Sequence, residues 1–228
     1  MSDLTILLFQ HRDDFTSVVP MDPKTDKIIA LDMTAANTDL SSDIVNDIDL
    51  FSSYIKNTIA SHNARYAIGG YGEHRTIYSR SKVFDGDDEP RRLHLGLDIW
   101  GEPDTPVVAP LNGIVHSSAY NGEHGDYGAT IILEHELDGR IFYSLYGHLS
   151  FADLQIKTGS QVTKGSIFAH FGNPDENGCW PPHLHYQLIE DIGSHKGDYP
   201  GVCRYSEKDR YLNNCPDPDL ITRLYRYV

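Results

Sequence analysis

The sequence has few basic side chains, few cysteines and no long apolar run, and each scarcity excludes a class of protein. Lys and Arg together number 19 against 33 Asp and Glu, a formal net charge of -14 with His neutral. Such a chain is poorly suited to the phosphate backbone of a nucleic acid, so we expect no nucleic-acid partner. No apolar stretch approaches the roughly 18 residues that cross a bilayer, so we expect no membrane span.

The three cysteines, Cys179, Cys203 and Cys215, are an odd number without CxxC spacing. This usage favours free thiols in a reducing compartment over a disulfide framework, although a Cys203–Cys215 bridge stays open. The first residues also lack the basic n-region and the apolar core of a signal peptide. We therefore expect a cytoplasmic protein, or a periplasmic or secreted one if a leader has been removed.

The chain divides into two parts with different patterns. Residues 1–90 contain one amphipathic helix at about 43–60, whose apolar side chains recur every three or four residues. Residues 91–228, which include a C-terminal tail, consist mostly of short β runs, and Asp138-Gly139 is a strong two-residue hairpin signal. The expected strands are 95–100, 106–109, 113–117, 129–135, 140–145, 166–171 and 183–189. The pattern predicts a mainly β fold, an antiparallel β-sandwich or partly open barrel, with an α+β N-terminal extension.

Histidine, by contrast, is abundant at 12 residues, and two segments space it as a metal site requires. His94 and Asp98 are four residues apart, and His183 and His185 are two apart, so each pair shares one face of a strand. Gly96 is expected to leave room on that face for an ion. Two imidazoles and a carboxylate suit a metal that keeps an open position for water. Spacing alone allows Zn²⁺, Fe²⁺ or Mn²⁺.

A third segment, Tyr146-Gly-His148-Leu-Ser150, ends an apolar strand and supplies another histidine. The run that begins at His135 lacks the second histidine of an HExxH motif, so a histidine has to act as the base in any metal-assisted hydrolysis. Candidates to line a cleft are Tyr143, Tyr146, Trp180, Tyr186, His74 and His116. By the period-two pattern, Tyr146 fits the core equally well.

Together these segments resemble the lysostaphin-type zinc endopeptidases, a family of β-domain enzymes that cleave peptidoglycan peptides. The resemblance runs from about Arg92 to Ile189 with its elements in the family's order. These are His94-Leu-Gly-Leu-Asp98, Thr105-Pro-Val-Val-Ala-Pro-Leu-Asn-Gly-Ile-Val115, Tyr146-Gly-His-Leu-Ser150, Thr158-Gly-Ser-Gln-Val-Thr-Lys-Gly165 and Pro182-His-Leu-His-Tyr186. The resemblance implies the family's duplicated hybrid motif and one Zn²⁺ held by His94, Asp98 and His185. It also implies that His148 and His183 are catalytic groups beside the bound water.

The chain departs from that family just before His183. A small-residue turn is replaced there by Gly172-Asn-Pro-Asp-Glu-Asn-Gly-Cys-Trp180, which changes a wall of the cleft. Three other segments, 75–80, 197–203 and 215–218, resemble a subgroup in which a similar domain is fused to a kinase-like domain and a class III, pyridoxal-phosphate aminotransferase.

The expected function is hydrolysis of a peptide bond by a zinc-dependent endopeptidase or amidase whose substrate is a peptide or muropeptide. Of His148 and His183, one is expected to take the proton of the attacking water and the other to stabilise the oxyanion or protonate the leaving amine. Two alternatives remain. One is a non-catalytic zinc-binding or partner-binding module on the same fold. The other is a swinging-arm carrier domain, for which Lys164 lacks the hairpin-tip context. Residues 1–90 are expected either to wall the cleft or to inhibit it.

Overall fold

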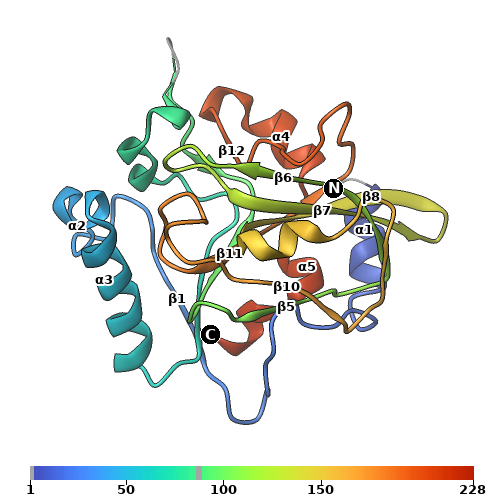
Figure 1. Ribbon diagram of the computed structural model, residues 1–228, viewed down its shortest axis with the longest axis horizontal. Coiled ribbons are helices and arrows are strands. Elements are labelled where there is room, and N and C mark those ends of the chain that lie inside the picture. Colours follow the sequence, from blue (N-terminus) through green and yellow to red (C-terminus); the bar gives the residue numbers. More distant parts are fainter. Residues whose placement is uncertain (1–2, 86–88) are drawn as a thin grey trace.

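The computed structural model describes residues 3–85 and 89–228 (Figure 1). Its strands are β1 (Ile28–Ala30), β2 (Tyr66–Gly69), β3 (Leu93–His94), β4 (Leu97–Trp100), β5 (Pro106–Val108), β6 (Gly113–Asn121), β7 (Gly128–Leu137), β8 (Arg140–Leu149), β9 (Gln161–Val162), β10 (Ile167–His170), β11 (His183–Ile189) and β12 (Val202–Cys203). The central sheet has eight strands in the order β1-β2-β4-β11-β8-β7-β6-β9, and the pairs β10-β5 and β12-β3 form two small sheets. The predicted mainly β fold is therefore confirmed.

The long strands of the sheet are joined as the sequence predicts. Leu137 pairs with Arg140 across the turn between β7 and β8. Asp138 and Gly139, with φ of 49° and 78°, both adopt the positive φ that a type I′ hairpin turn requires. Strands β6, β7, β8 and β11 are antiparallel neighbours. These hairpins bring the histidines of β8 and β11 to neighbouring strands.

One strand pair corrects the antiparallel prediction. Strands β1 and β2 run parallel, so the central sheet is mixed. The reason is that helices α2 (Ser42–Asn46) and α3 (Ile48–Ser61) lie between them in the chain and provide the long crossover that parallel strands need. Figure 1 shows these helices on one side of the molecule, away from the long β6, β7 and β8. The finer expectation of a sandwich built on a duplicated motif stays a prediction.

The predicted helix at 43–60 is two helices in the structure, interrupted at Asp47. This residue has an extended backbone (φ -106°, ψ 115°), and its side chain accepts hydrogen bonds from the backbone N–H groups of Asp49 and Leu50. An aspartate in that geometry is an N-cap, so the interruption starts α3 with satisfied donors. The other helical segments are α1 (Asp3–Gln10), η1 (Thr76–Arg80), η2 (Lys82–Phe84), η3 (Phe151–Gln155), η4 (Tyr205–Glu207), α4 (Lys208–Asn214), α5 (Asp219–Thr222) and η5 (Leu224–Tyr227).

Residues before position 90 take part in the same sheet and the same core as those after it. Leu4 and Leu8 of α1 and Ile68 of β2 are buried in one cluster with Leu97 and Leu184. Strand β2 is antiparallel to β4, and its last residue, Gly69, pairs with Asp98. The expected boundary at residue 90 thus falls between elements that pack together, and the first part of the chain helps to position β4.

Two further features of the structure bear on the sequence-based expectations. The three cysteines are free, and Cys203 and Cys215 are buried. Among the described residues, no helix combines the length and the apolar character needed to cross a membrane.

Candidate metal centre

Three strands, β3, β4 and β11, bring His94, Asp98 and His185 together. Strand β11 pairs with β4 so that His185 lies directly opposite Asp98, and His94 precedes β4 on β3. One possible ligand atom from each residue falls within 4.8 Å of the other two. All three are buried, with exposed fractions of 0%, 4% and 3% for His94, Asp98 and His185. The predicted convergence is therefore present, but the prediction of one strand for His94 and Asp98 is corrected, because β3 ends at His94 and β4 begins at Leu97.

The atoms that face one another in this cluster are suited to a cation. His94 Nδ1 lies 3.0 Å from the carbonyl oxygen of Gly70, which can only accept, so the ring carries its proton there and Nε2 is a lone pair. That Nε2 is 3.2 Å from Asp98 Oδ1, and His185 Nδ1 lies 3.0 Å from both atoms. Ligands about 2.0–2.1 Å from a tetrahedral Zn²⁺ are roughly 3.3–3.4 Å apart. The residues present thus fit a divalent metal.

The missing side chain of Gly96 makes room for the ring of His185 rather than for an ion. A Cβ atom at Gly96 would lie 2.5 Å from Cε1 and 2.6 Å from Nε2 of His185. Such distances are impossible contacts, so the missing side chain makes room for the imidazole ring of a ligand. The expectation that it leaves room for the ion itself is corrected.

Asp98 is held as a carboxylate by a buried arginine. The Nη1 atom of Arg75, a residue with an exposed fraction of 0%, lies 2.5 Å from Asp98 Oδ2, and its Nε lies 2.9 Å from Glu73 Oε2. Burial opposes ionisation of Asp98, but His94 and Arg75 outweigh it and hold the pKa of the carboxyl well below its usual range. Arg75 therefore compensates the buried charge and leaves Oδ1 free for a metal.

His148 and His183 lie side by side at the same pocket. Their ring centroids are 4.1 Å apart. His148 Nδ1 is 2.8 Å from the carbonyl oxygen of Asn177, and His183 Nδ1 is 2.7 Å from that of Pro181. Both rings therefore keep a proton on Nδ1 and a lone pair on Nε2. Burial lowers the pKa of His183 to about 4 and that of His148 well below its usual range, so both rings are neutral at pH 7.

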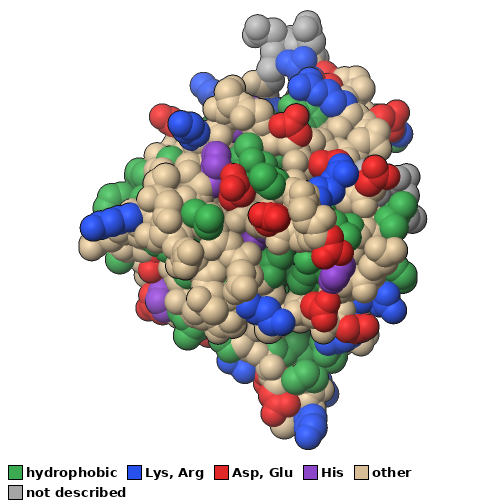
Figure 2. Space-filling model, turned by 90° about the vertical axis from the view of Figure 1, so that its right-hand side faces the viewer, with side chains coloured by type: hydrophobic (Ala, Val, Ile, Leu, Met, Phe, Trp, Pro, Cys, Tyr) green, Lys and Arg blue, Asp and Glu red, His purple; other side chains and the backbone are tan. Residues whose placement is uncertain are grey.

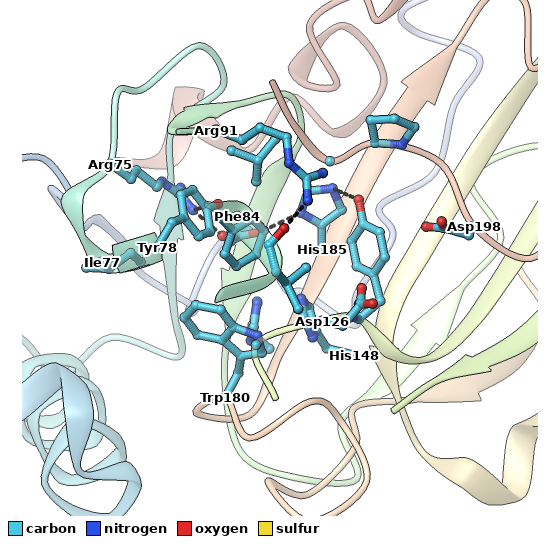
Figure 3. Close-up of a pocket in the computed structure, with 18 of the residues that line it drawn as sticks. Arg75, Ile77, Tyr78, Phe84, Arg91, Asp126, His148, Trp180, His185 and Asp198 are labelled. Atoms are coloured by element: carbon cyan, nitrogen blue, oxygen red, sulfur yellow. Dashed lines mark hydrogen bonds and ion pairs between the residues drawn. The ribbon is translucent and has the colours of Figure 1, made fainter. Parts of the chain in front are cut away.

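These groups open onto one pocket with a volume of about 170 Å³. Figure 3 shows Tyr78 and Trp180 on one side of it and Asp198 on the opposite side. Phe51 of α3, with Tyr78 of η1 and Phe84 of η2, lines the pocket from the part of the chain before position 90. That part of the chain therefore walls the pocket. On the face in Figure 2, acidic side chains lie interspersed with basic ones.

The sequence predicted only part of this lining. Trp180 lines the pocket as expected, whereas Tyr146 and Tyr186 are fully buried in the core. Tyr143 packs on His116 with ring centroids 5.2 Å apart, and neither lines the pocket, nor does His74. Tyr127 and His195 do line it, yet no spacing or motif identified them. Asn177 and Arg75 were also missed, because a main-chain carbonyl and a long-range ion pair leave no local pattern.

A carboxylate and two histidines around a possible ion, with two more neutral histidines at the same pocket, are typical of hydrolases that use a metal. Comparisons with known proteins agree with that class. Residues 92–197 match the model of Peptidase family M23. The matched region carries all five residues, so the site lies within the part of the chain that is similar to this family.

Two curated relatives have described activities. The chain is 28% identical over 149 residues to the L-Ala--D-Glu endopeptidase of Bacillus subtilis, covering 63% of this chain and 43% of that protein. It is 30% identical over 116 residues to the peptidoglycan DD-endopeptidase ShyC of Vibrio cholerae, covering 47% of this chain and 24% of that protein. The chain thus spans less than half the length of these curated relatives.

Solved structures of similar proteins include two peptidases. The catalytic domain of the antimicrobial peptidase lysostaphin from Staphylococcus simulans is 21% identical with a TM-score of 0.42, covering 70% of this chain and 96% of that one. A zinc containing peptidase from Vibrio cholerae is 24% identical with a TM-score of 0.36, covering 48% of this chain and 32% of that one.

Proposed function

We propose that this protein is a zinc-dependent endopeptidase or amidase that hydrolyses a peptide bond in a peptide or muropeptide. One observation carries the proposal: the buried His94, Asp98 and His185 converge beside the pocket that His148 and His183 line. Zinc is proposed over iron or manganese because the set of two imidazoles and one carboxylate is a common catalytic zinc set. The two relatives named as endopeptidases support the substrate class.

The roles of the residues follow from the atoms they expose. When bound, the metal supplies a Lewis acid and lowers the pKa of a water to about 7. His148 and His183 each offer a lone pair at Nε2, so one of them accepts the proton of the attacking water. The ring that has accepted a proton becomes a donor at the same atom, and it then protonates the leaving nitrogen.

Two finer features are proposed with this function. The chain is related to the subgroup in which the domain is fused to a class III aminotransferase, and its strands repeat a hybrid motif packed as a sandwich. Both rest on the sequence segments that resemble that family and subgroup.

The test combines metal analysis with product analysis. Purified protein is assayed for bound zinc and is incubated with muropeptides and with ordinary peptides, and the product masses identify the bond cut. We expect cleavage that a chelator stops and zinc restores. A zinc-loaded protein that cuts neither substrate would favour the non-catalytic module, and a protein that cuts in excess chelator would contradict the metal-dependent mechanism.

A further inference from the structure

We propose that Gln187 is a positioning residue that makes His185 bind the metal through Nδ1, and that the chain segment after residue 197 completes this arrangement. The inference rests on the proposed metal site. It concerns the side of His185 that faces away from His94 and Asp98, where the sequence analysis predicted no residue. Gln187 lies two residues further along β11, on the same face of the strand as His185.

The orientation of the Gln187 amide is determined by its partners. Its Nε2 lies 3.1 Å from the carbonyl oxygen of Pro200 and 3.4 Å from Sγ of Cys215. A carbonyl oxygen can only accept, so the amide nitrogen has to face Pro200 and the amide oxygen has to face the other way. Both Gln187 and Cys215 are completely buried, so water does not compete for these bonds. The amide therefore has one orientation.

That orientation assigns the proton of His185. Gln187 Oε1 lies 3.0 Å from His185 Nε2, and because the oxygen only accepts, Nε2 has to carry the hydrogen. A neutral imidazole has one N–H, so Nδ1 is left with its lone pair. Nδ1 is the atom that lies 3.0 Å from Asp98 Oδ1 and from His94 Nε2. A metal ligand whose other nitrogen donates to an oxygen is fixed in tautomer and ring orientation.

A tyrosine on the neighbouring loop supports the same assignment. The Tyr127 hydroxyl lies 3.2 Å from the carbonyl oxygen of Tyr199, to which it donates its only hydrogen. Its oxygen is also 3.4 Å from His185 Nε2, so it presents a lone pair to that nitrogen. Two acceptors thus face Nε2, and no donor among the described contacts of that atom competes with them.

The acceptors depend on a segment outside the region that matches the family model. That region ends at residue 197, whereas Pro200 and Cys215 lie beyond it. The backbone N–H of Leu95 donates to the carbonyl of Gly201 at 2.8 Å, which ties the segment to the chain between β3 and β4. A Cβ at Gly201 would come within 1.8 Å of the Tyr127 hydroxyl, so the segment packs directly on these groups. The outer side of the metal site is therefore built by this chain's own C-terminal part.

Zinc affinity of matched variants tests the role of Gln187. Gln187→Leu keeps the bulk of the side chain and removes the acceptor, and Gln161→Leu is the control because Gln161 is exposed on β9. Competition with a chelating dye should show zinc binding weakened about 10- to 100-fold in Q187L, as for other lost partners of ligating histidines, and unchanged in Q161L. Equal zinc affinity of folded Q187L and wild type would overturn the proposal.

The second measurement needs no variant. Imidazole nitrogen chemical shifts of His185 in zinc-loaded wild-type protein report which nitrogen binds the metal and which carries the hydrogen. We expect Nε2–H, and Nδ1–H would overturn the proposal even if Q187L fails to fold. Failure of the proposed function looks different: the wild type would then bind zinc with Nε2–H on His185 and still cut no peptide.

Discussion

His148 and His183 owe their tautomers to the loop that precedes β11. Their Nδ1 atoms donate to main-chain carbonyls of that loop, and a carbonyl oxygen can only accept a hydrogen bond. The loop is held in turn by the buried side chain of Asn177, whose amide bonds to the backbone of Gly172 and of Trp180 at 3.1 and 3.0 Å. At the scale of single residues, the segment that departs from the resembled family therefore orients His148 through Asn177, and the residue directly after it, Pro181, orients His183.

Substituting His148 separates catalysis from metal binding. His148→Ala should keep zinc, because the residue lies outside the His-Asp-His cluster, while kcat falls roughly 10²- to 10⁴-fold. His124→Ala, at an exposed histidine, is the matched control and should leave kcat unchanged. Zinc content and kcat of both variants check this, and undiminished turnover in H148A would remove His148 from the mechanism.

A buried histidine away from the metal cluster should make stability depend on pH. His135 donates from Nδ1 to the carbonyl of Asn112 at 2.8 Å, and burial lowers its pKa to about 4 from the ordinary 6.5. The unfolded chain therefore binds this proton more tightly. The contribution is fully present above pH 6.5 and is lost as the pH falls to 4, by about 3 kcal/mol in all.

The measurement is the free energy of unfolding in denaturant at pH 7 and pH 4.5, with chelator present. His135→Gln should lose less stability on acidification than the wild type. His62→Gln, at an exposed site, should behave like the wild type. A wild-type pH dependence in H135Q would show that His135 is not the group responsible.

At the scale of elements, the ladder between β4 and β11 decides whether the ligands meet. Gly96, directly before β4, lies against the ring of His185, where an added Cβ would lie 2.5 Å from Cε1. Gly96→Ala should displace the ring and abolish zinc binding. Gly139→Ala, in the β7–β8 turn, should instead cost stability because of its φ of 78°, yet keep zinc. Zinc titration of the folded variants distinguishes the two, and tight binding by G96A would show that the strand can adapt.

Several elements could be predicted from sequence because their signals are local. The Asp138-Gly139 turn and the alternating runs around it predicted the β7–β8 hairpin, and His-x-His on a strand predicted two rings on one face. By contrast, the break at Asp47 was not predicted. The apolar residues on both sides continue the amphipathic pattern past it, so the N-cap leaves no visible signal. Strand β2 was missed because it is short and wholly buried, with no alternation to reveal it.

The same distinction applies to the site. The candidates were found from local signals. His183 and His185 are two apart on one strand, the spacing of His94 and Asp98 indicated a pair, and His148 ends an apolar strand. Arg75 and Gln187 were missed because their roles exist only after long-range pairing, β2 with β4 for the first and the return of the chain at Pro200 for the second. Local sequence patterns therefore indicate the candidate residues of the cluster better than they indicate the groups that orient them.

At the scale of the whole molecule, one core joins the first helix to the β strands. Leu8 of α1 has an exposed fraction of 0%, and Ile6 on the same helix has 45%. Leu8→Ala should lower the free energy of unfolding of the entire protein by about 2–5 kcal/mol, whereas Ile6→Ala should change it by less than about 0.5 kcal/mol. Denaturant titrations followed by two probes check this. A separate early transition of α1 in L8A would contradict a shared core.

The groups around the metal cluster come from widely separated parts of the chain. Gly70 and Arg75, before position 90, contact His94 and Asp98, and Pro200 and Cys215, near the C-terminus, hold Gln187 against His185. An ion bound by His94, Asp98 and His185 should therefore stabilise both parts of the chain together. At a free zinc concentration 1,000 times the Kd, it should stabilise the fold by about 4 kcal/mol. Backbone amides of β2 and of β12 should then gain protection from hydrogen exchange together, so that metal loading is recorded at both ends of the protein at once.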